Sequence, residues 1–132
     1  MSNKEVKYRA YIKETNQVVD VEAIYLALGS QSGKDIVALG NWYSIEEVEL
    51  LQFTGLKDES NKNIYEGDIV CETYEGVRDI GLVYFSEGMF KVNFQSTEDF
   101  ALSGCDLEQT EVIGNVFMEK EKYKDLYEFY IL

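Results

Sequence analysis

The chain has 132 residues, about the length of one domain, and carries 25 acidic and 12 basic residues, no histidine and no proline. The net charge of −13 argues against a general nucleic-acid binder, because such a surface repels phosphate and cannot release its counterions. The absence of histidine removes the commonest general base and metal ligand.

The acidic residues are concentrated in the middle of the chain. Residues 41–111 hold sixteen acidic and four basic residues, whereas residues 1–10 carry a net charge of +2. This charge suits solubility or a basic protein partner, and a solvated acidic surface is the simpler interpretation. The first ten residues lack the apolar core of a signal peptide, and no apolar run approaches the ~20 residues of a membrane span. With Cys71 and Cys105 far apart in sequence, we expect a reduced, cytoplasmic protein with no membrane partner.

Short strands and turns alternate in the first half of the chain. The alternation of Val6, Tyr8, Ala10 and Ile12 predicts a strand buried on one face. The polar residues and glycines that follow predict a turn at 14–17, a returning strand at 18–26 and a loop at 29–33, before a short apolar run at 36–38.

A helix signal then precedes the second half. Ser44 and Glu47 fit a capping box, which predicts a short helical turn and then a strand through Phe53. The polar run 54–63 is predicted to be a loop. Strands with glycine turns at regular spacing favour a small barrel or sandwich, and they are expected at 68–74, 79–85, 89–94 and 111–117. The helical spacing of four apolar residues then predicts a C-terminal helix, on Tyr123, Leu126, Tyr127 and Tyr130.

The stretches that come close to catalytic or cofactor-binding motifs lack the residues or the spacing that those motifs require. The stretch 29–34 has three residues between its glycines, not the four of a phosphate loop, and Asp35 follows its lysine. The run 58–63 lacks the glycine and the final glutamate of a calcium loop. Glu66 and Asp68 would share a face of a strand, but chance carboxylate pairs are expected in so acidic a chain. We therefore predict no catalytic, cofactor-binding or metal-binding residue and no enzyme activity, although a carboxylate-only magnesium site remains conceivable.

Aromatic residues are abundant, with ten tyrosines and seven phenylalanines. Most are expected to fill the core, and tyrosine is also enriched at protein–protein interfaces. Aromatic side chains in a small barrel can stack on bases, but that use needs a basic groove, and only Lys7 and Arg9 offer one.

Three blocks of the sequence resemble the YopX family of phage and prophage proteins. The signature is carried by QFTGLKD at 52–58 and IYEGDIV at 64–70. The segment KYRAY at 7–11 is similar to the family's N-terminal strand, with Tyr11 in place of the usual tryptophan, and EVIGNVF at 111–117 is similar to its C-terminal strand. The blocks lie in order between about residues 6 and 118 of the 132.

The resemblance implies a mainly β fold with an SH3-like barrel in the C-terminal half. We divide the single YopX-like domain into N-terminal strands at 1–53, a barrel at 54–118 and a helical tail at 119–132. The signature residues are interpreted as structural; they are Arg9, Thr54, Gly55, Leu56, Tyr65, Gly67, Asp68, Gly114 and Asn115. Arg9 is a charged residue in an apolar strand, and we expect it to pair with a carboxylate such as Asp68.

The resemblance also implies phage origin, location in the cytoplasm of a bacterial host and self-assembly, and no established activity. The first hypothesis is a non-enzymatic accessory protein that forms a homo-oligomer. The second is an acidic decoy that binds a basic, nucleic-acid-binding host protein. The third is nucleic-acid binding through the barrel, which is fold-level analogy and disfavoured by the charge.

Overall fold

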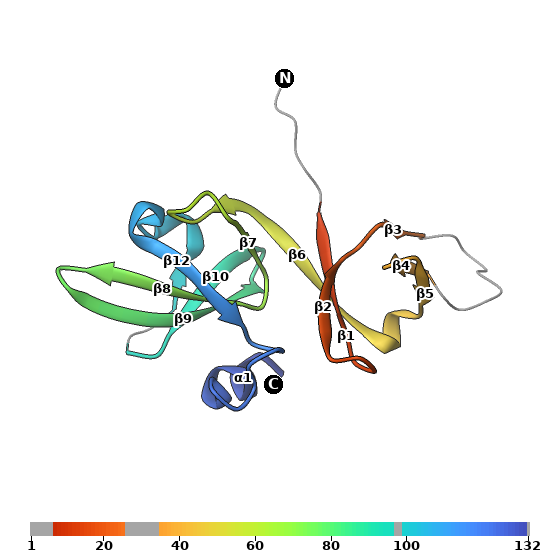
Figure 1. Cartoon of the computed structure of the whole chain (residues 1–132). Coiled ribbons are helices and arrows are strands. Elements are labelled where there is room, and N and C mark those ends of the chain that lie inside the picture. Colours follow the sequence, from red (N-terminus) through yellow and green to blue (C-terminus); the bar gives the residue numbers. More distant parts are fainter. Residues whose placement is uncertain (1–6, 26–34, 97–98, 132) are drawn as a thin grey trace, which may run out of the picture.

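Short antiparallel strands form nearly all of the structure, as Figure 1 shows for the computed structural model, which describes residues 7–25, 35–96 and 99–131. The strands are β1 (Tyr8–Ile12), β2 (Gln17–Asp20), β3 (Ala23–Ile24), β4 (Ile36–Ala38), β5 (Asn41–Tyr43), β6 (Val48–Lys57), β7 (Asn63–Tyr65), β8 (Asp68–Tyr74), β9 (Val77–Ser86), β10 (Met89–Phe94), β11 (Phe100–Ala101) and β12 (Thr110–Asn115). Single 3₁₀ turns lie at Ile45–Glu47, Leu102–Gly104 and Leu107–Gln109, and α1 spans Lys124–Ile131.

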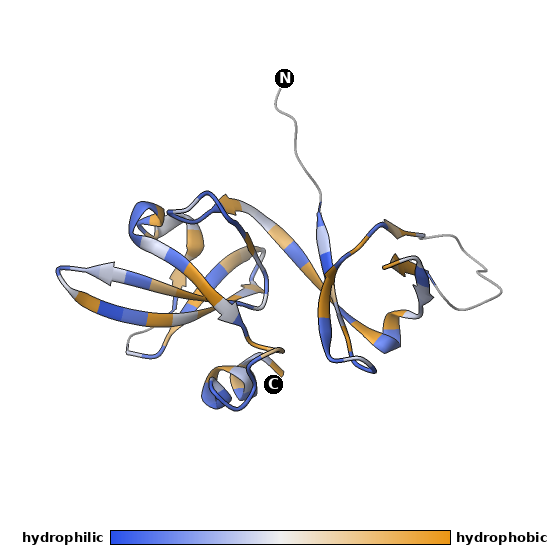
Figure 2. Ribbon diagram, viewed as in Figure 1, coloured by the Kyte–Doolittle hydropathy of each residue, from blue (hydrophilic) through white to orange (hydrophobic). Residues whose placement is uncertain are grey.

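The strands form three sheets. In the N-terminal half, β2-β1-β6-β7 make one sheet and β3-β4-β5 a smaller one; in the C-terminal half, β11-β10-β9-β8-β12 make a five-stranded sheet. The five-stranded sheet curls in Figure 1, which is consistent with the expected SH3-like barrel. Along the strands, Figure 2 shows hydrophilic and hydrophobic residues alternating in bands, the pattern of a sheet with one face toward a core. The predicted mainly β fold with a short C-terminal helix is confirmed.

The long strand β6 connects the two halves. Its first part pairs with β1, from Val48↔Ile12 to Gln52↔Tyr8, and its second part pairs with β7. The strand therefore runs through the boundary drawn at residue 53. The loop predicted at 54–63 is too long, because β6 continues to Lys57, bends where Gly55 adopts φ +86°, and forms a hairpin with β7.

Strand β1 is buried on both faces, contrary to the expectation of one solvent-facing side. Ala10 and Ile12 pack into one apolar cluster with Ile36 and Val48. Tyr11 points to the other face and enters a cluster formed mainly by the second half of the chain. Alternation in the sequence could not show that a core lies on each side of this strand.

The cluster around Tyr11 joins the two halves of the molecule. The Tyr11 ring stacks on Phe117 with centroids 4.8 Å apart, and both lie against Leu51 of β6. The Phe117 ring also makes edge contacts with Tyr127 and Tyr130 of α1, at 6.1 and 5.2 Å. Strands from both halves and the helix therefore share one core.

Three short segments of the N-terminal half were also predicted from the sequence. The strand predicted at 18–26 is two short strands, β2 and β3, which lie in different sheets. The capping box is confirmed, since the Ser44 N–H donates to the Glu47 carboxylate at 3.0 Å. The loop predicted at 29–33 lies outside the described residues.

We predict that Phe117→Ala lowers the free energy of unfolding by about 3–5 kcal/mol, because it removes the ring between the two halves and leaves a cavity. Urea denaturation followed by circular dichroism measures the loss. Tyr74→Ala is the matched control, since that ring is 69% exposed and its removal should change stability by about 0.5 kcal/mol or less. A loss for Phe117→Ala no larger than the control's would show that the halves do not depend on this ring.

Candidate binding crevice

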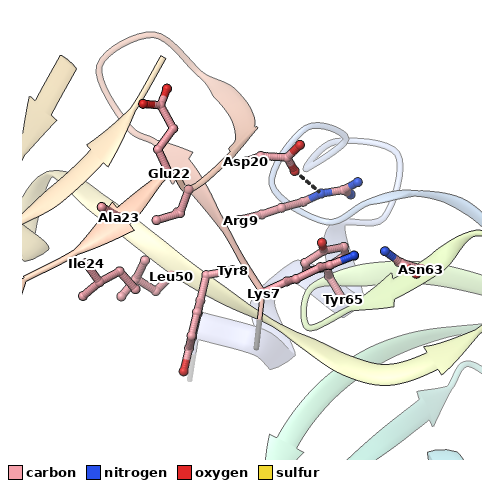
Figure 3. Close-up of a pocket in the computed structure, with 11 residues that line it drawn as sticks. Lys7, Tyr8, Arg9, Asp20, Glu22, Ala23, Ile24, Leu50, Asn63 and Tyr65 are labelled. Atoms are coloured by element: carbon pink, nitrogen blue, oxygen red, sulfur yellow. Dashed lines mark hydrogen bonds and ion pairs between the residues drawn. The ribbon is translucent and has the colours of Figure 1, made fainter. Parts of the chain in front are cut away.

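An open crevice lies between β1, the segment from β2 to β3, and β7, with a volume of about 770 Å³ (Figure 3). At one end, Figure 3 places the cations of Lys7 and Arg9 beside Asn63 and Tyr65. The opposite end is apolar and is formed by Tyr8, Ala23, Ile24 and Leu50. We call this the β1–β3 crevice. Asp20 and Glu22 also line it, so the crevice combines two cations, two carboxylates and apolar surface in a chain that is strongly acidic overall.

Arg9 is held at this crevice by two contacts. Its Nε donates to Oδ1 of Asp20 on the neighbouring strand at 3.3 Å, and its guanidinium lies 4.2 Å from the centroid of the buried Tyr65 ring. Arg9 and Asp20 are direct partners in the β1–β2 register, which explains the pairing. The expected carboxylate partner was Asp68; the ion pair is made with Asp20 instead, and only the Arg9 charge reaches Asp68.

Arg9 also borders a second crevice, of about 710 Å³, on the side toward β12. Here Lys62 and Asp68 face Asn115 and Glu119. Within the described part of the chain, the Glu119 Oε2 atom is buried without a hydrogen-bond partner, and the buried Asn115 amide lies close enough to Asp68 to favour its ionised form. Gly114 makes room for Glu119, because a Cβ at Gly114 would come within 2.3 Å of the Glu119 Oε2 atom.

Asp68, which lines the second crevice, and Glu66, two residues before it, both have raised pKa values. Burial raises the pKa of Asp68 from 3.8 to about 6, although the Tyr65 N–H, which donates to Oδ2 at 2.8 Å, and the Arg9 charge both favour the ionised form. Burial also raises the pKa of Glu66, against the N–H of Gln52 and the Tyr130 hydroxyl that donate to it. Both carboxylates thus accept hydrogen bonds from the backbone around the turn between β7 and β8.

The predicted signature residues fall into two groups. Arg9, Tyr65 and Asp68 meet at the crevices, and Gly114 and Asn115 line the second one. The other four have structural positions: the Thr54 Oγ1 donates to the Ile64 carbonyl at 2.7 Å, Gly55 forms the bend of β6, Leu56 packs on a core cluster, and Gly67 adopts φ +87° between β7 and β8.

Sequence reasoning missed Asp20, Lys62, Asn63 and Glu119 as crevice residues. It also missed Asp58, whose Oδ1 accepts from the N–H groups of Ser60 and Lys62 and whose Oδ2 accepts from the Val112 N–H at 2.9 Å. Its place at the start of a polar turn is the one signal that could have indicated this role. Through these hydrogen bonds Asp58 links the β6–β7 hairpin to β12.

In the part of the chain that the structure describes, no group of three or more cysteine or carboxylate side chains is placed to hold a metal ion. Cys71 and Cys105 are free thiols, and burial raises the pKa of Cys105 to about 11. Among the described helices, none has the length and apolar character needed to cross a membrane.

Comparison with known proteins then decides the family. The model of the family described as YopX protein matches residues 7–122, which include both crevices. The chain belongs to the YopX family.

Two crystal structures share the fold. Protein EF1440 from Enterococcus faecalis is 19% identical, with a TM-score of 0.64 over 91% of this chain and 99% of that one. Protein yopX from Bacillus subtilis is 23% identical, with a TM-score of 0.59 over 87% and 95% of the two chains. A search of curated protein sequences finds no match. At these identities the likeness establishes the fold alone.

We predict that the free energy of unfolding of the Asp68→Asn variant increases, relative to that of the native chain, as the pH rises. The folded native chain keeps the Asp68 proton up to a pKa of about 6 and the unfolded chain only to its ordinary 3.8, so the native chain loses stability between these values. The gap between the two free energies of unfolding should therefore shift by about 1–3 kcal/mol in favour of the variant across that window.

Urea denaturation of both chains at several pH values between 4 and 6 measures this shift. Asp125→Asn, at an exposed position on α1, is the matched control. A difference between Asp68→Asn and the native chain that stays constant with pH would show that Asp68 does not titrate in this window.

Proposed function

We propose that this protein is a non-enzymatic assembly module of a phage or prophage, which associates with copies of itself in the cytoplasm of a bacterial host. The observation that carries this proposal is the exposure of large apolar side chains at two separate places. Tyr25 and Trp42 stack with centroids 5.2 Å apart beside β3 and β5 and are each 50% exposed. Tyr74 and Val77, at the turn between β8 and β9, are 69% and 68% exposed. Exposed aromatic surface of this kind is typical of protein interfaces.

The distribution of charge supports the same proposal. Residues 58–132 contain 17 acidic and 6 basic residues, a net charge of −11, whereas residues 1–57 contain 8 and 6, a net charge of −2. One half of the molecule is therefore far less repulsive to an acidic partner than the other. The β1–β3 crevice, with Lys7 and Arg9, lies in this less acidic half.

The non-enzymatic part of the proposal is supported by what the perturbed carboxylates do. Asp68 and Glu66 accept hydrogen bonds from the N–H groups of Tyr65 and Gln52, so both are engaged in holding the turn around Gly67. Carboxylates used in this way serve the fold rather than proton transfer to a substrate.

We predict that the purified chain is larger than 15.2 kDa in light scattering behind a sizing column. The size should increase with moderate salt, because screening reduces the repulsion between two chains of charge −13. A strict monomer at every soluble concentration and salt would contradict self-association.

A second candidate function is favoured by the charge of −11 on residues 58–132. An acidic face of this kind could occupy a basic host protein that normally binds nucleic acid, with electrostatic steering to speed the encounter. Affinity capture from host lysate should then recover a basic, nucleic-acid-binding protein.

The salt dependence separates the two functions. Capture of a basic partner should weaken with salt, whereas association of two acidic chains should strengthen. Failure to recover any salt-sensitive partner would remove the decoy function and leave self-association untouched.

A further inference from the structure

The tip of the β8–β9 hairpin exposes more apolar surface than its own fold requires. Tyr74 and Val77 are paired across the turn, and they are the most exposed large apolar side chains of the described residues. Neither packs on a core cluster. In Figure 1 the hairpin projects away from the rest of the molecule, on the side opposite the β3–β4–β5 sheet.

The acidic residue at this tip, Glu75, has an unfavourable backbone conformation. Glu75 has φ +50° and Gly76 φ +81°, the two left-handed positions of a tight hairpin turn. Asparagine, aspartate or glycine is preferred at the first of these positions, and other residues cost about 1–2 kcal/mol there. The Glu75 side chain has no hydrogen bond or ion pair within the described part of the chain.

The next hairpin provides a comparison within the same sheet. Its turn is also Glu-Gly, and Glu87 likewise has a positive φ, of +54°. However, the Glu87 carboxylate accepts from the Lys91 ammonium at 3.1 Å, and the neighbouring Phe85 ring contacts Phe90. Among the described residues, the β8–β9 tip therefore combines an acidic group that has no ion pair with two exposed apolar side chains that pack on no core cluster.

The β1–β3 crevice has the complementary chemistry. Its cationic end holds Lys7 and Arg9, and its apolar end holds Tyr8, Ile24 and Leu50. A volume of about 770 Å³ lies within the range of sites that enclose several side chains.

The two acidic residues of the crevice do not prevent this fit. The Glu22 carboxylate accepts from the Gly40 N–H at 3.0 Å. Asp20 is 83% exposed, so an incoming carboxylate would compete with it for Arg9 at little cost.

We propose that the β8–β9 tip of one copy docks in the β1–β3 crevice of a second copy. The Glu75 carboxylate lies against Lys7 and Arg9, and Tyr74 and Val77 cover the apolar end. This inference rests on the self-association proposed above and names its contact. Because tip and crevice are different surfaces, the contact is head-to-tail and repeats into a ring or a linear chain.

The test reverses the charge on each side of the contact in the full chain. Glu75→Lys and Lys7→Glu should each weaken self-association about tenfold, because an attraction becomes a repulsion. The chain that carries both substitutions should recover most of the lost affinity, since opposite charges face each other again. Sedimentation velocity over a concentration series measures all three.

The control separates this contact from net charge. Glu75→Lys lowers the repulsion between chains in general, so a weakening runs against the non-specific effect. Glu87→Lys makes the same change of net charge in the neighbouring turn and should not weaken association. Tyr74→Ser tests the apolar part of the contact, and it should weaken association without changing the circular dichroism spectrum.

Mixing two variants tests the head-to-tail arrangement. A chain with Glu75→Lys still has an intact crevice, and a chain with Lys7→Glu still has an intact tip. The mixture should therefore associate where neither variant does alone, with the two variants alternating, because native tip meets native crevice at one contact and the two reversed charges face each other at the next. Single variants that associate like the native chain would overturn the docking while self-association stands, whereas a native chain that is always monomeric would overturn both.

Discussion

The stack of Tyr11 on Phe117 is the contact on which the arrangement of this protein depends. It connects a strand of the N-terminal half to the segment that follows the last strand of the C-terminal half, across Leu51 of the shared strand β6. Burying three large side chains in one cluster fixes how the two halves meet. It also explains why β1 has no solvent-facing side and why the C-terminal helix packs where it does.

The crevices are a consequence of this arrangement. In β1, which pairs with β6, Arg9 lies two residues before Tyr11 on the same face of the strand, so its guanidinium lies at the border of the shared core. Asp20 and the Tyr65 ring hold it there from two different strands. The acidic chain thus places two cations, Lys7 and Arg9, at the junction of its sheets, beside the carboxylates of Asp20 and Glu22 and apolar surface from β3 and β6.

Family membership places this fold among YopX proteins, and the signature residues now have physical roles. Gly67 keeps the turn between β7 and β8 close to Leu51 and Phe117, because a Cβ there would lie 3.4 and 3.5 Å from these side chains. Asp68 ties the same turn to the Tyr65 N–H. Gly67 and Asp68 of the signature therefore lie where the two halves are joined. Their contacts there give these two residues a structural explanation.

The sequence by itself determined the four longer strands of the second half, the capping box, the C-terminal helix and the concentration of acidic residues, because these depend on alternation, turn residues and composition within a few positions; it did not indicate the short strands β7 and β11. It could not determine that β6 continues through Thr54 or that Arg9 pairs with Asp20 rather than Asp68. Those outcomes depend on register between strands and on which faces meet a core. Only the tertiary structure decided them, since burial on both sides of a strand is a property of its neighbours and not of its own residues.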